Sequence, residues 1–472
     1  MPRLRCLVTI LFCLSLVTLA GCGDSTVETP KAWSTAERVV DTSLAPVVAG
    51  GGGITLMVWQ APDGIYFRQA IAGGEWSSPK RLFAITGSSG ELKLAMNSRG
   101  EGLLTWRYPY GGLSGTFTFR YHPGTGWDTY QILQGGIDGY VSDLDISLGD
   151  DGTAYLAAVI DGGKPVYATE RPGEGWSSVN EVVEGSPYLI TTSSTRIVAD
   201  ATGGAHLVWI APVIDNGTLT GNLAVYASHY TRSSGWSSPQ VINTPATDVG
   251  GLSLAADGNG NAIAVWKQTD TDIGRNGPMA LYSIRFCRDT GWDTAIAQDD
   301  GTSIAGTPSV VMNRRGDACI VWIGVTSAQD TTGRGSTSVF QLIGRRYTIN
   351  GGWEPPVSGE IVNNMISVSV SGQTSFWPAD MKVVAGSGSE FITTWSSANL
   401  VNNAIIFSVN SSRLTGAGTW TDRLLQDYIP VSSYNGDVLA TDGLGNVTVA
   451  WGQEFITADN TISAGIFASR YR

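Results

Sequence analysis

Four acidic residues in predicted loops have the side chains best suited to acid–base chemistry. They are Asp270, Asp272, Asp330 and Glu454, and each follows an apolar run that contains a Trp. Cleavage of a glycosidic bond needs two carboxyl groups that face each other across the sugar, about 5 to 9.5 Å apart. If two of these residues converge, the chain can act as a glycoside hydrolase or a lyase.

Other residues in the predicted loops can form a binding surface. Trp377, beside Phe376 and Pro378, stands outside the repeated Trp positions described below. A Trp that the fold does not need can stack on a sugar or insert into a partner, but it can equally cover a channel mouth or pack against a neighbouring loop. The other candidates for the lining are Tyr108, Tyr110, Tyr428, Tyr434, Arg275 and Arg334, together with the four acidic residues. The alternative is that these are ordinary solvated loop residues.

The cysteines and histidines form no pattern that predicts a metal site. Cys287 and Cys319 remain once the N-terminal segment is set aside, and they fall on predicted strands of neighbouring repeats. Facing sheets lie about 10 Å apart, whereas a disulfide needs Cα atoms within about 7 Å, so two separate buried thiols are favoured. The three histidines, His122, His206 and His229, also fall on predicted strands and resemble ordinary repeat positions.

One turn resembles a calcium-binding loop. Asp257-x-Asn259-x-Asn261 places oxygen-bearing side chains at alternate positions, as a calcium site requires. No Glu follows at the distance of a bidentate ligand, so a hairpin turn is favoured. We therefore predict neither a metal nor a cofactor.

The elements that hold these residues are short strands in a repeated unit, which we name A to D. In one copy, strands A and B cover residues 252–256 and 262–266. The segment that joins them, Asp257-Gly258-Asn259-Gly260-Asn261, is rich in Gly and Asn and favours a tight hairpin. Strand C covers residues 281–286, and strand D begins at Trp292. Runs of Val, Ile, Trp and Tyr bounded by Gly, Asn, Asp and Ser indicate strands, and no long segment has the period of a helix.

The number of repeats follows from two columns of Trp. Strand D begins with Trp33, Trp76, Trp127, Trp176, Trp236, Trp292, Trp353 and Trp420. Strand B carries Trp59, Trp106, Ala158, Trp209, Trp266, Trp322, Trp395 and Trp451 at its matching position. Four antiparallel strands in each of eight repeats predict an all-β fold, an eight-bladed β-propeller.

The two ends of the chain predict how the ring closes. Residues 466–472 form a strand C that no Gly-Trp follows, whereas residues 32–40 resemble the strand D at residues 235–242 and precede any strand A. We therefore expect the N-terminal strand to complete the C-terminal blade. Closure of this kind removes the open sheet edge between the first and last blades.

The N-terminal segment predicts a lipid anchor. Arg3 and Arg5 precede an apolar run over residues 6–19, and Leu19-Ala20-Gly21-Cys22 resembles the lipobox of bacterial lipoproteins. This resemblance implies a signal peptide over residues 1–22, a lipid-modified Cys22 and, because Gly23 follows it, retention in the outer membrane of the bacterial cell envelope. An ordinary secretory signal or a short transmembrane anchor is the alternative. Residues 23–31 form a polar tether, and residues 32–472 form the propeller.

Composition limits the partners. The formal net charge of −12 becomes −14 if Arg3 and Arg5 are removed with the signal, which disfavours nucleic acid and anionic lipid as partners. A closed ring shares a continuous core and does not divide at a linker, so we expect one domain and a monomer.

The predicted loops vary most on one face. The B–C connections at residues 210–222, 267–279, 323–339 and 452–465 are long, and so is the D–A connection at residues 355–380. Because variable loops carry recognition, this face over blades four to eight is the expected binding surface. We expect a membrane-anchored binding or scaffold propeller that engages a protein or an envelope glycan. A multivalent lectin with one sugar site in each groove between blades is a further alternative.

Two short motifs carry a family resemblance. Gly-Trp-Ser-Ser-Pro at residues 235–239 and Gly-Asn-Ala-Ile-Ala-Val-Trp at residues 260–266 resemble the sialidase-like (BNR-type) repeats of bacterial propeller lipoproteins. The resemblance covers residues 32–472 and implies the fold, not an activity. Sialidases also carry Asp-box turns, which this sequence lacks, and an arginine triad that binds the substrate carboxylate.

Four arginines are candidates for such a triad. Arg120, Arg285, Arg346 and Arg470 occupy one position of strand C, and the other blades have Gln69, Glu170, His229 and Asn410 there. A catalytic group should break a repeat once, whereas these residues follow it. Polar positions on a blade face or inter-blade ion pairs are therefore favoured.

Overall fold

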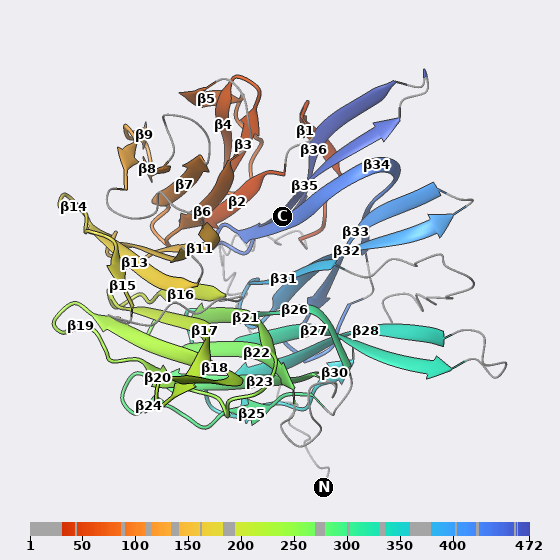
Figure 1. The fold of residues 1–472 in the computed structure, drawn as a ribbon. Coiled ribbons are helices and arrows are strands. Elements are labelled where there is room, and N and C mark those ends of the chain that lie inside the picture. Colours follow the sequence, from red (N-terminus) through yellow and green to blue (C-terminus); the bar gives the residue numbers. More distant parts are fainter. Residues whose placement is uncertain are drawn as a thin grey trace, which may run out of the picture.

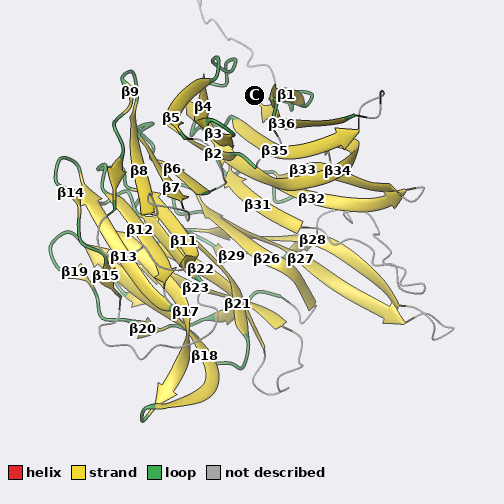
Figure 2. Ribbon diagram, turned by 45° about the horizontal axis from the view of Figure 1, so that its top comes forward, coloured by secondary structure: helices red, strands yellow, loops and turns green. Residues whose placement is uncertain are grey.

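The computed structural model describes most of the chain from residue 31 onwards. The described residues are 31–42, 45–85, 90–108, 115–133, 141–160, 163–182, 194–269, 279–299, 303–329, 336–358, 379–401, 404–421, 424–456, 459 and 461–472. All of their regular elements are strands (Figure 2). Among these residues, none belongs to a helix with the length and apolarity needed to cross a membrane.

The strands form eight antiparallel blades in a ring, which confirms the predicted all-β, eight-bladed propeller. Strand A is β2 (Val47–Gly51), β6 (Glu91–Met96), β11 (Val141–Leu148), β16 (Thr195–Ala199), β21 (Val249–Ala256), β26 (Ser303–Met312), β31 (Ala379–Ala385) and the second part of β34 (Leu424–Thr441). Strand B is β3 (Ile54–Ala61), β7 (Gly102–Tyr108), β12 (Ala154–Ile160), β17 (Ala205–Asp215), β22 (Ala262–Thr269), β27 (Ala318–Gln329), β32 (Phe391–Val401) and β35 (Val447–Ile456).

The outer strands complete each blade. Strand C is β4 (Gly64–Ile71), β8 (Gly115–His122), β13 (Lys164–Arg171), β18 (Thr218–Thr231), β23 (Met279–Cys287), β28 (Ser336–Thr348), β33 (Ala404–Leu414) and β36 (Ile462–Tyr471). Strand D is β5 (Lys80–Ala84) in blade 1, the first part of β34 in blade 7 and β1 (Glu37–Val40) in blade 8. In blades 2 to 6 it is a pair of two-residue strands: β9 (Gly126–Trp127) and β10 (Gln131–Ile132), β14 (Gly175–Trp176) and β15 (Asn180–Glu181), β19 (Gly235–Trp236) and β20 (Gln240–Val241), β24 (Gly291–Trp292) and β25 (Ile296–Ala297), β29 (Gly352–Trp353) and β30 (Val357–Ser358).

The A strands lie innermost and contact one another around the ring. Each contacts the A strand of the next blade, and β34 contacts β2 to complete the circle. Figure 1 follows the chain once around, from the red strands of blade 1 through yellow and green to the blue strands that return beside them. A side chain on an A strand or an A–B turn can therefore meet a residue from a distant part of the sequence.

The ring closes through the N-terminal strand, as the sequence predicts. Strand β1 pairs antiparallel with β36, with Glu37 opposite Ala468. Ahead of β1, the backbone N–H of Ala32 donates to the carbonyl of Arg472 at 3.0 Å. Val39 is buried in a cluster that includes Met57 and Trp59 of blade 1, so the closing strand also packs on the first blade.

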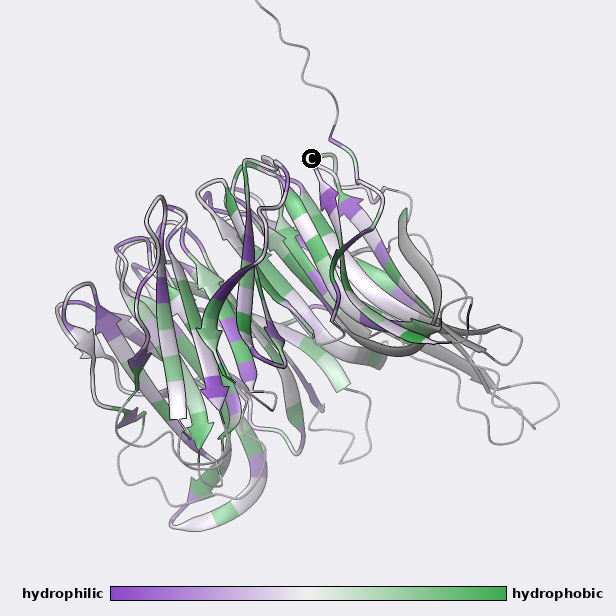
Figure 3. Ribbon diagram, turned by 90° about the horizontal axis from the view of Figure 1, so that it is seen from above, coloured by the Kyte–Doolittle hydropathy of each residue, from purple (hydrophilic) through white to green (hydrophobic). Residues whose placement is uncertain are grey.

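The two Trp columns have different environments. The strand B tryptophans are at most 2% exposed and form the centre of each blade (Figure 3 shows the apolar stretches along the strands). The strand D tryptophans are half-buried and lie against strand C of the preceding blade: the indole N–H of Trp176 donates to Thr118 Oγ1 at 2.9 Å. At the equivalent place in blade 6, a side chain on residue 344 would collide with Trp420, which explains Gly344.

Two expectations about connections are wrong. The predicted loop that carries Tyr428 and Tyr434 is instead part of one long strand that joins blades 7 and 8, because β34 pairs with β33 at one end and with β35 at the other. The predicted loop at residues 210–222 is instead an extended hairpin of β17 and β18, closed by Asn216 and Gly217 with φ of 48° and 78°. Asn-Gly supplies the positive φ values that a tight hairpin needs. In the same way β27, β28 and β35 continue into the predicted loops at residues 323–339 and 452–465.

The A–B turns share one hydrogen-bonding scheme, so the turn at Asp257 is a hairpin turn as expected. Asp257 Oδ1 accepts the backbone N–H groups of Asn259 and Asn261, at 2.7 and 2.9 Å. Asp257 Oδ2 accepts from Asn261 Nδ2 at 2.7 Å. The same backbone bonds are made by Asn97, Asp200, Asn313 and Asp442 in four other blades.

Candidate ligand-binding site

Most of the loop residues proposed as a site fall outside the part of the chain that the structure describes. These are Trp377, Tyr110, Asp270, Asp272, Arg275, Asp330 and Arg334. The predicted loop face and the proposed carboxylate pairs therefore remain predictions. Tyr428 and Tyr434 fall within strand β34, so their assignment to a loop is wrong.

The two remaining candidates, Tyr108 and Glu454, are described, and both lie on strands rather than in loops. Tyr108 ends β7, and its half-buried ring lies 5.0 Å from that of Trp106 within an apolar cluster between blades 1 and 2. Glu454 lies within β35, paired with Ser433 on one side and Ala464 on the other. The loop interpretation of these two residues is corrected because the B–C hairpins continue as paired strands.

The strand C arginines join neighbouring blades, as the sequence analysis favours. Arg120 of blade 2 pairs with Glu170 of blade 3 at 2.9 Å. Arg346 of blade 6 donates to the carbonyl of Gly416 in blade 7 at 2.9 Å. Arg470 of blade 8 pairs with Glu75 of blade 1 at 3.1 Å. These contacts are structural, so the arginines are not gathered around one ligand.

The register of strand C corrects two members of this column. In blade 2 the column residue Arg120 lies opposite Leu103 of strand B, and the strand B Trp, Trp106, follows Leu103 by three residues. By this pairing, blade 3 has Thr169 in the column instead of Glu170, and blade 7 has Arg413 instead of Asn410. Asn410 pairs with Trp395 itself and is fully buried.

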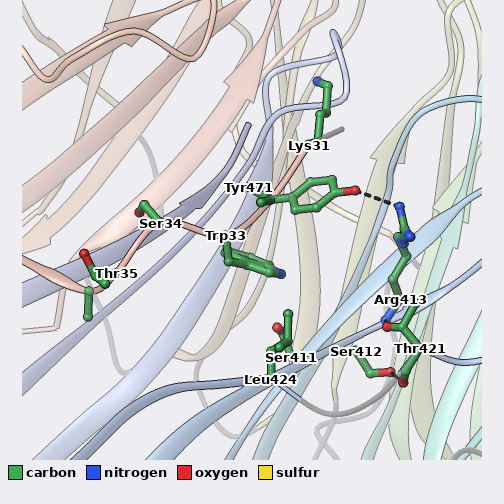
Figure 4. A pocket seen from close by; sticks show the side chains of 12 residues that line it. Lys31, Trp33, Ser34, Thr35, Ser411, Ser412, Arg413, Thr421, Leu424 and Tyr471 are labelled. Atoms are coloured by element: carbon green, nitrogen blue, oxygen red, sulfur yellow. Dashed lines mark hydrogen bonds between the residues drawn. The ribbon is translucent and has the colours of Figure 1, made fainter. Parts of the chain in front are cut away.

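The corrected residue Arg413 lines a cleft between blades 7 and 8. The cleft has a volume of about 660 Å³ and opens between the N-terminal strand of blade 8 and strands β33 and β34 of blade 7 (Figure 4). Its lining includes residues 31–36, Ser411, Ser412, Arg413, Thr421, Leu424 and Tyr471. Thus the segment that closes the ring also forms one wall of the cleft.

Aromatic rings and hydroxyl groups provide the chemistry of this cleft. Trp33 and Tyr471 lie with ring centroids 5.7 Å apart and an interplanar angle of 50°. Ser34, Thr35 and Thr421 add hydroxyl groups, whereas Ser411 is fully buried and Ser412 donates to the carbonyl of Thr421 at 2.8 Å. Leu424 is 50% exposed. Such a lining suits a ligand with one apolar face and several hydroxyl groups.

Both cations of the cleft are already engaged. Arg413 donates to the Tyr471 hydroxyl at 2.7 Å and pairs with Glu390 at 3.3 Å. Lys31 donates to Asn446 Oδ1 at 2.7 Å and to the carbonyl of Leu444 at 3.2 Å. The lining therefore offers little uncompensated charge to an anionic ligand.

A regular spacing in the sequence identifies Arg413 as the column residue of blade 7. In blades 1 to 7 the column residue lies seven positions before the strand D Trp, as Arg120 lies before Trp127 and Arg285 before Trp292. Counting back from Trp420 gives Arg413. Trp33 belongs to the strand D column, and nothing local in the sequence distinguishes its partly open position.

A second hollow lies where the A–B turns of blades 2 to 6 converge. It has a volume of about 230 Å³ and is lined by residues of β6, β11, β16, β21 and β26 with their turns. Arg314 of blade 6 and Asp150 of blade 3 pair across it at 2.9 Å. Asp150 also accepts from the backbone N–H and hydroxyl of Ser98, at 2.9 and 2.7 Å. These contacts engage Arg314, Asp150 and Ser98 with one another.

The two cysteines are free thiols with different surroundings. Cys287 is half-buried, and hydrogen bonding from the backbone of Asp289 lowers the pKa of its thiol. Cys319 is fully buried, and burial raises the pKa of its thiol. The expectation of separate thiols agrees with this arrangement, although only one of the two is buried.

Comparisons with known proteins concern the fold. No protein-family model matches the chain, and no curated protein matches it in sequence. Similar solved structures include the polysaccharide lyase Uly1, at 11% identity and a TM-score of 0.47 over 93% of this chain and 99% of that one. An ulvan lyase of family PL25 has 12% identity and a TM-score of 0.46 over 81% and 96%. The Aleuria aurantia lectin has 14% identity and a TM-score of 0.36 over 73% and 100%. All three TM-scores are below 0.5, so the propeller assignment rests on the strand topology of this chain and not on these likenesses.

Proposed function

We propose that this protein is a lipid-anchored glycan-binding propeller whose binding site is the cleft between blades 7 and 8. The observation that carries the proposal is the cleft itself, with Trp33 and Leu424 partly open beside a cluster of hydroxyl groups. A volume of about 660 Å³ lies within the range of small-molecule sites. Binding of a protein partner at the long-loop face stays a prediction, because it concerns residues outside the described ranges.

The charges of the cleft favour a neutral sugar. Arg413 is compensated by Glu390, and Lys31 is held by the turn of blade 8. The whole chain carries a net charge of −12, which would repel a polyanionic glycan. Recognition would therefore depend on stacking against Trp33 and on hydrogen bonds to hydroxyl groups.

The position of the cleft supports a role close to a membrane. Lys31 and Ala32, which end the predicted tether, belong to the lining. Only residues 23–30 separate them from Cys22, so an acylated Cys22 would hold the cleft near the outer-membrane surface. Stable anchoring requires more than one acyl chain, which lipidation of a lipobox cysteine provides.

Anchoring has its own test. When the full-length chain is produced in bacteria, the wild type should be recovered in the membrane fraction carrying acyl chains. Cys22→Ser should be recovered in the soluble envelope fraction with the same fold. A wild-type chain that is soluble and lacks acyl chains would remove the anchor from the proposal.

Glycan binding is tested with variants that fill the cleft. Leu424 lies opposite Ser411 in blade 7, just as Ile296 lies opposite Ser283 in blade 5. The side chains of Leu424 and Ile296 are 50% and 42% exposed. After a glycan array identifies a ligand, Leu424→Trp should weaken its binding at least about tenfold, whereas Ile296→Trp should not. Absence of any bound glycan, or equal affinity of the two variants, would contradict the proposal.

A further inference from the structure

Three residues with metal-binding side chains come together between blades 4 and 5. Asp200 begins the A–B turn after β16, His206 lies on β17, and His229 lies opposite it on β18. One ligand atom from each of the three lies within 4.8 Å of the others. This cluster is distinct from the cleft between blades 7 and 8.

The imidazole of His206 is buried without hydrogen-bond partners. Its side chain is fully buried between His229, at a centroid distance of 4.7 Å, and Phe286, at 4.6 Å. Neither ring nitrogen makes a hydrogen bond of normal geometry, although the backbone of Gly260 lies near enough to affect titration. Buried polar atoms without partners are rare, and an ion at the site is one physical explanation.

The turn presents one carboxylate oxygen to this imidazole. Asp200 Oδ1 accepts from the backbone of Thr202 and Gly204, at 2.7 and 2.9 Å. In the turns of blades 5 and 8, the second oxygen is bound by the amide of Asn261 or Asn446. Gly204 takes that place in blade 4.

The absence of an amide at residue 204 leaves Asp200 Oδ2 facing the histidine. Asp200 Oδ2 lies 3.9 Å from His206 Nε2. No Lys or Arg among the described residues forms an ion pair with this carboxylate, which is 2% exposed. A buried carboxylate without a cation is costly, and a bound metal ion would offset that cost.

The two histidines depart from the repeat. The same opposed positions hold Leu103 and Arg120 in blade 2, and Ile263 and Arg285 in blade 5. None of the other blades has a His at either position. The propeller fold therefore does not require this pair.

We propose that Asp200, His206 and His229 bind one divalent transition-metal ion such as Zn²⁺. Two imidazoles and a carboxylate are a common donor set for such ions, and water would complete the coordination. The histidine rings are stacked with an interplanar angle of 23°, so their lone pairs do not converge on one point. Binding therefore requires the half-buried His229 ring to turn out of the stack.

The test is metal binding by the protein purified without a histidine tag. After equilibration with Zn²⁺ or Co²⁺ and removal of free ions, the wild type should retain about one ion per chain, and the Co²⁺ form should show the absorption bands of nitrogen and oxygen coordination. Nuclear magnetic resonance should show the His229 ring signals shifting as the stack opens.

Three variants and one substitute variant complete the test. His206→Leu and His229→Arg install the side chains found in blade 2, and each should weaken metal binding at least about tenfold. His122→Ala removes the third histidine, which is exposed and paired with Asp128, and should bind as the wild type does. A wild type that retains no ion, or undiminished metal binding by folded His229→Arg, would overturn the proposal. If His206→Leu does not fold, His229→Gln replaces it as the second variant of a proposed ligand.

Discussion

The guanidinium of Arg120 and the carboxylate of Glu170 form a 2.9 Å ion pair that joins β8 of blade 2 to β13 of blade 3. The two side chains are 12% and 5% exposed. Arg120 also donates to the carbonyl of Gly152, in the A–B turn of blade 3, at 2.7 Å. Contact between these two blades is therefore specified by charge and hydrogen bonds as well as by apolar packing.

Removal of Glu170 should be strongly destabilising. Glu170→Ala leaves a nearly buried guanidinium without its carboxylate, which should lower the free energy of unfolding by about 3 to 5 kcal/mol. Glu390→Ala breaks the pair with Arg413 at the same column position, where both side chains are about one-third exposed, and should cost less than about 1 kcal/mol. Urea unfolding measures both, and equal losses would show that burial does not decide the strength of these pairs.

Ring closure should depend on the N-terminal strand. A chain that begins at residue 41 lacks β1 and Trp33, so the edge of β36 and the apolar surface under Val39 become exposed. We expect this chain to melt at a lower temperature and to self-associate, because an open strand edge can pair with another chain. A chain that begins at Lys31 is the control, and identical melting and monomeric behaviour of the two would contradict the closure.

The A–B turns should tolerate an exchange of donor and acceptor. Blade 5 pairs Asp257 with Asn261, whereas blade 6 pairs Asn313 with Asp317 at the same positions. Asp257→Asn alone sets two amides against each other and should cost about 1 to 2 kcal/mol. The double variant Asp257→Asn/Asn261→Asp copies blade 6 and should recover most of that loss in thermal unfolding. Additive losses in the double variant would refute the pairing.

The metal-free protein should lose stability as the pH falls below 6.5. Burial lowers the pKa of His206 in the folded state to about 3, whereas the unfolded chain takes up a proton near pH 6.5. Protonation therefore favours the unfolded state throughout this window, and the contribution is fully present above pH 6.5. Between pH 6.5 and 5 the free energy of unfolding should fall by about 2 kcal/mol from this residue.

The control for this pH dependence is built into the chain. With a chelator present, His206→Leu should show a shallower loss over the same range, and His122→Ala should follow the wild type. A wild-type stability that is constant between pH 6.5 and 5 would mean that His206 is not held neutral by burial.

The architecture could be predicted from the sequence because short local patterns mark the strands of each repeat. Trp266 with Trp292, and their counterparts in the other blades, mark strands B and D at fixed places within each repeat. The resemblance of residues 32–40 to strand D then determined how the ring closes, which the pairing of β1 with β36 confirms.

Other features depend on register or on distant contacts. Phe407-Ser-Val-Asn410 resembles Tyr282-Ser-Ile-Arg285, yet the long hairpin of blade 7 moves the true column position to Arg413. The cleft requires residues 31–36 and 411–424 to meet, although they are distant in sequence. The histidine cluster could not be recognised from the sequence. Gly204 leaves Asp200 Oδ2 without the amide partner that Asn261 or Asn446 supplies in other blades, and this difference is visible only when the turns are compared in the structure.

The central claim is that a glycan binds where the closing strand meets blade 7. The measurement that tests it most directly is a crystal structure of the protein with the glycan that its array binding identifies. We predict a sugar ring against Trp33, between Leu424 and Tyr471, with its hydroxyl groups bound by the serines and threonines of the cleft. A glycan bound instead at the A–B turn hollow or on the long-loop face, with the cleft between blades 7 and 8 empty, would contradict the account.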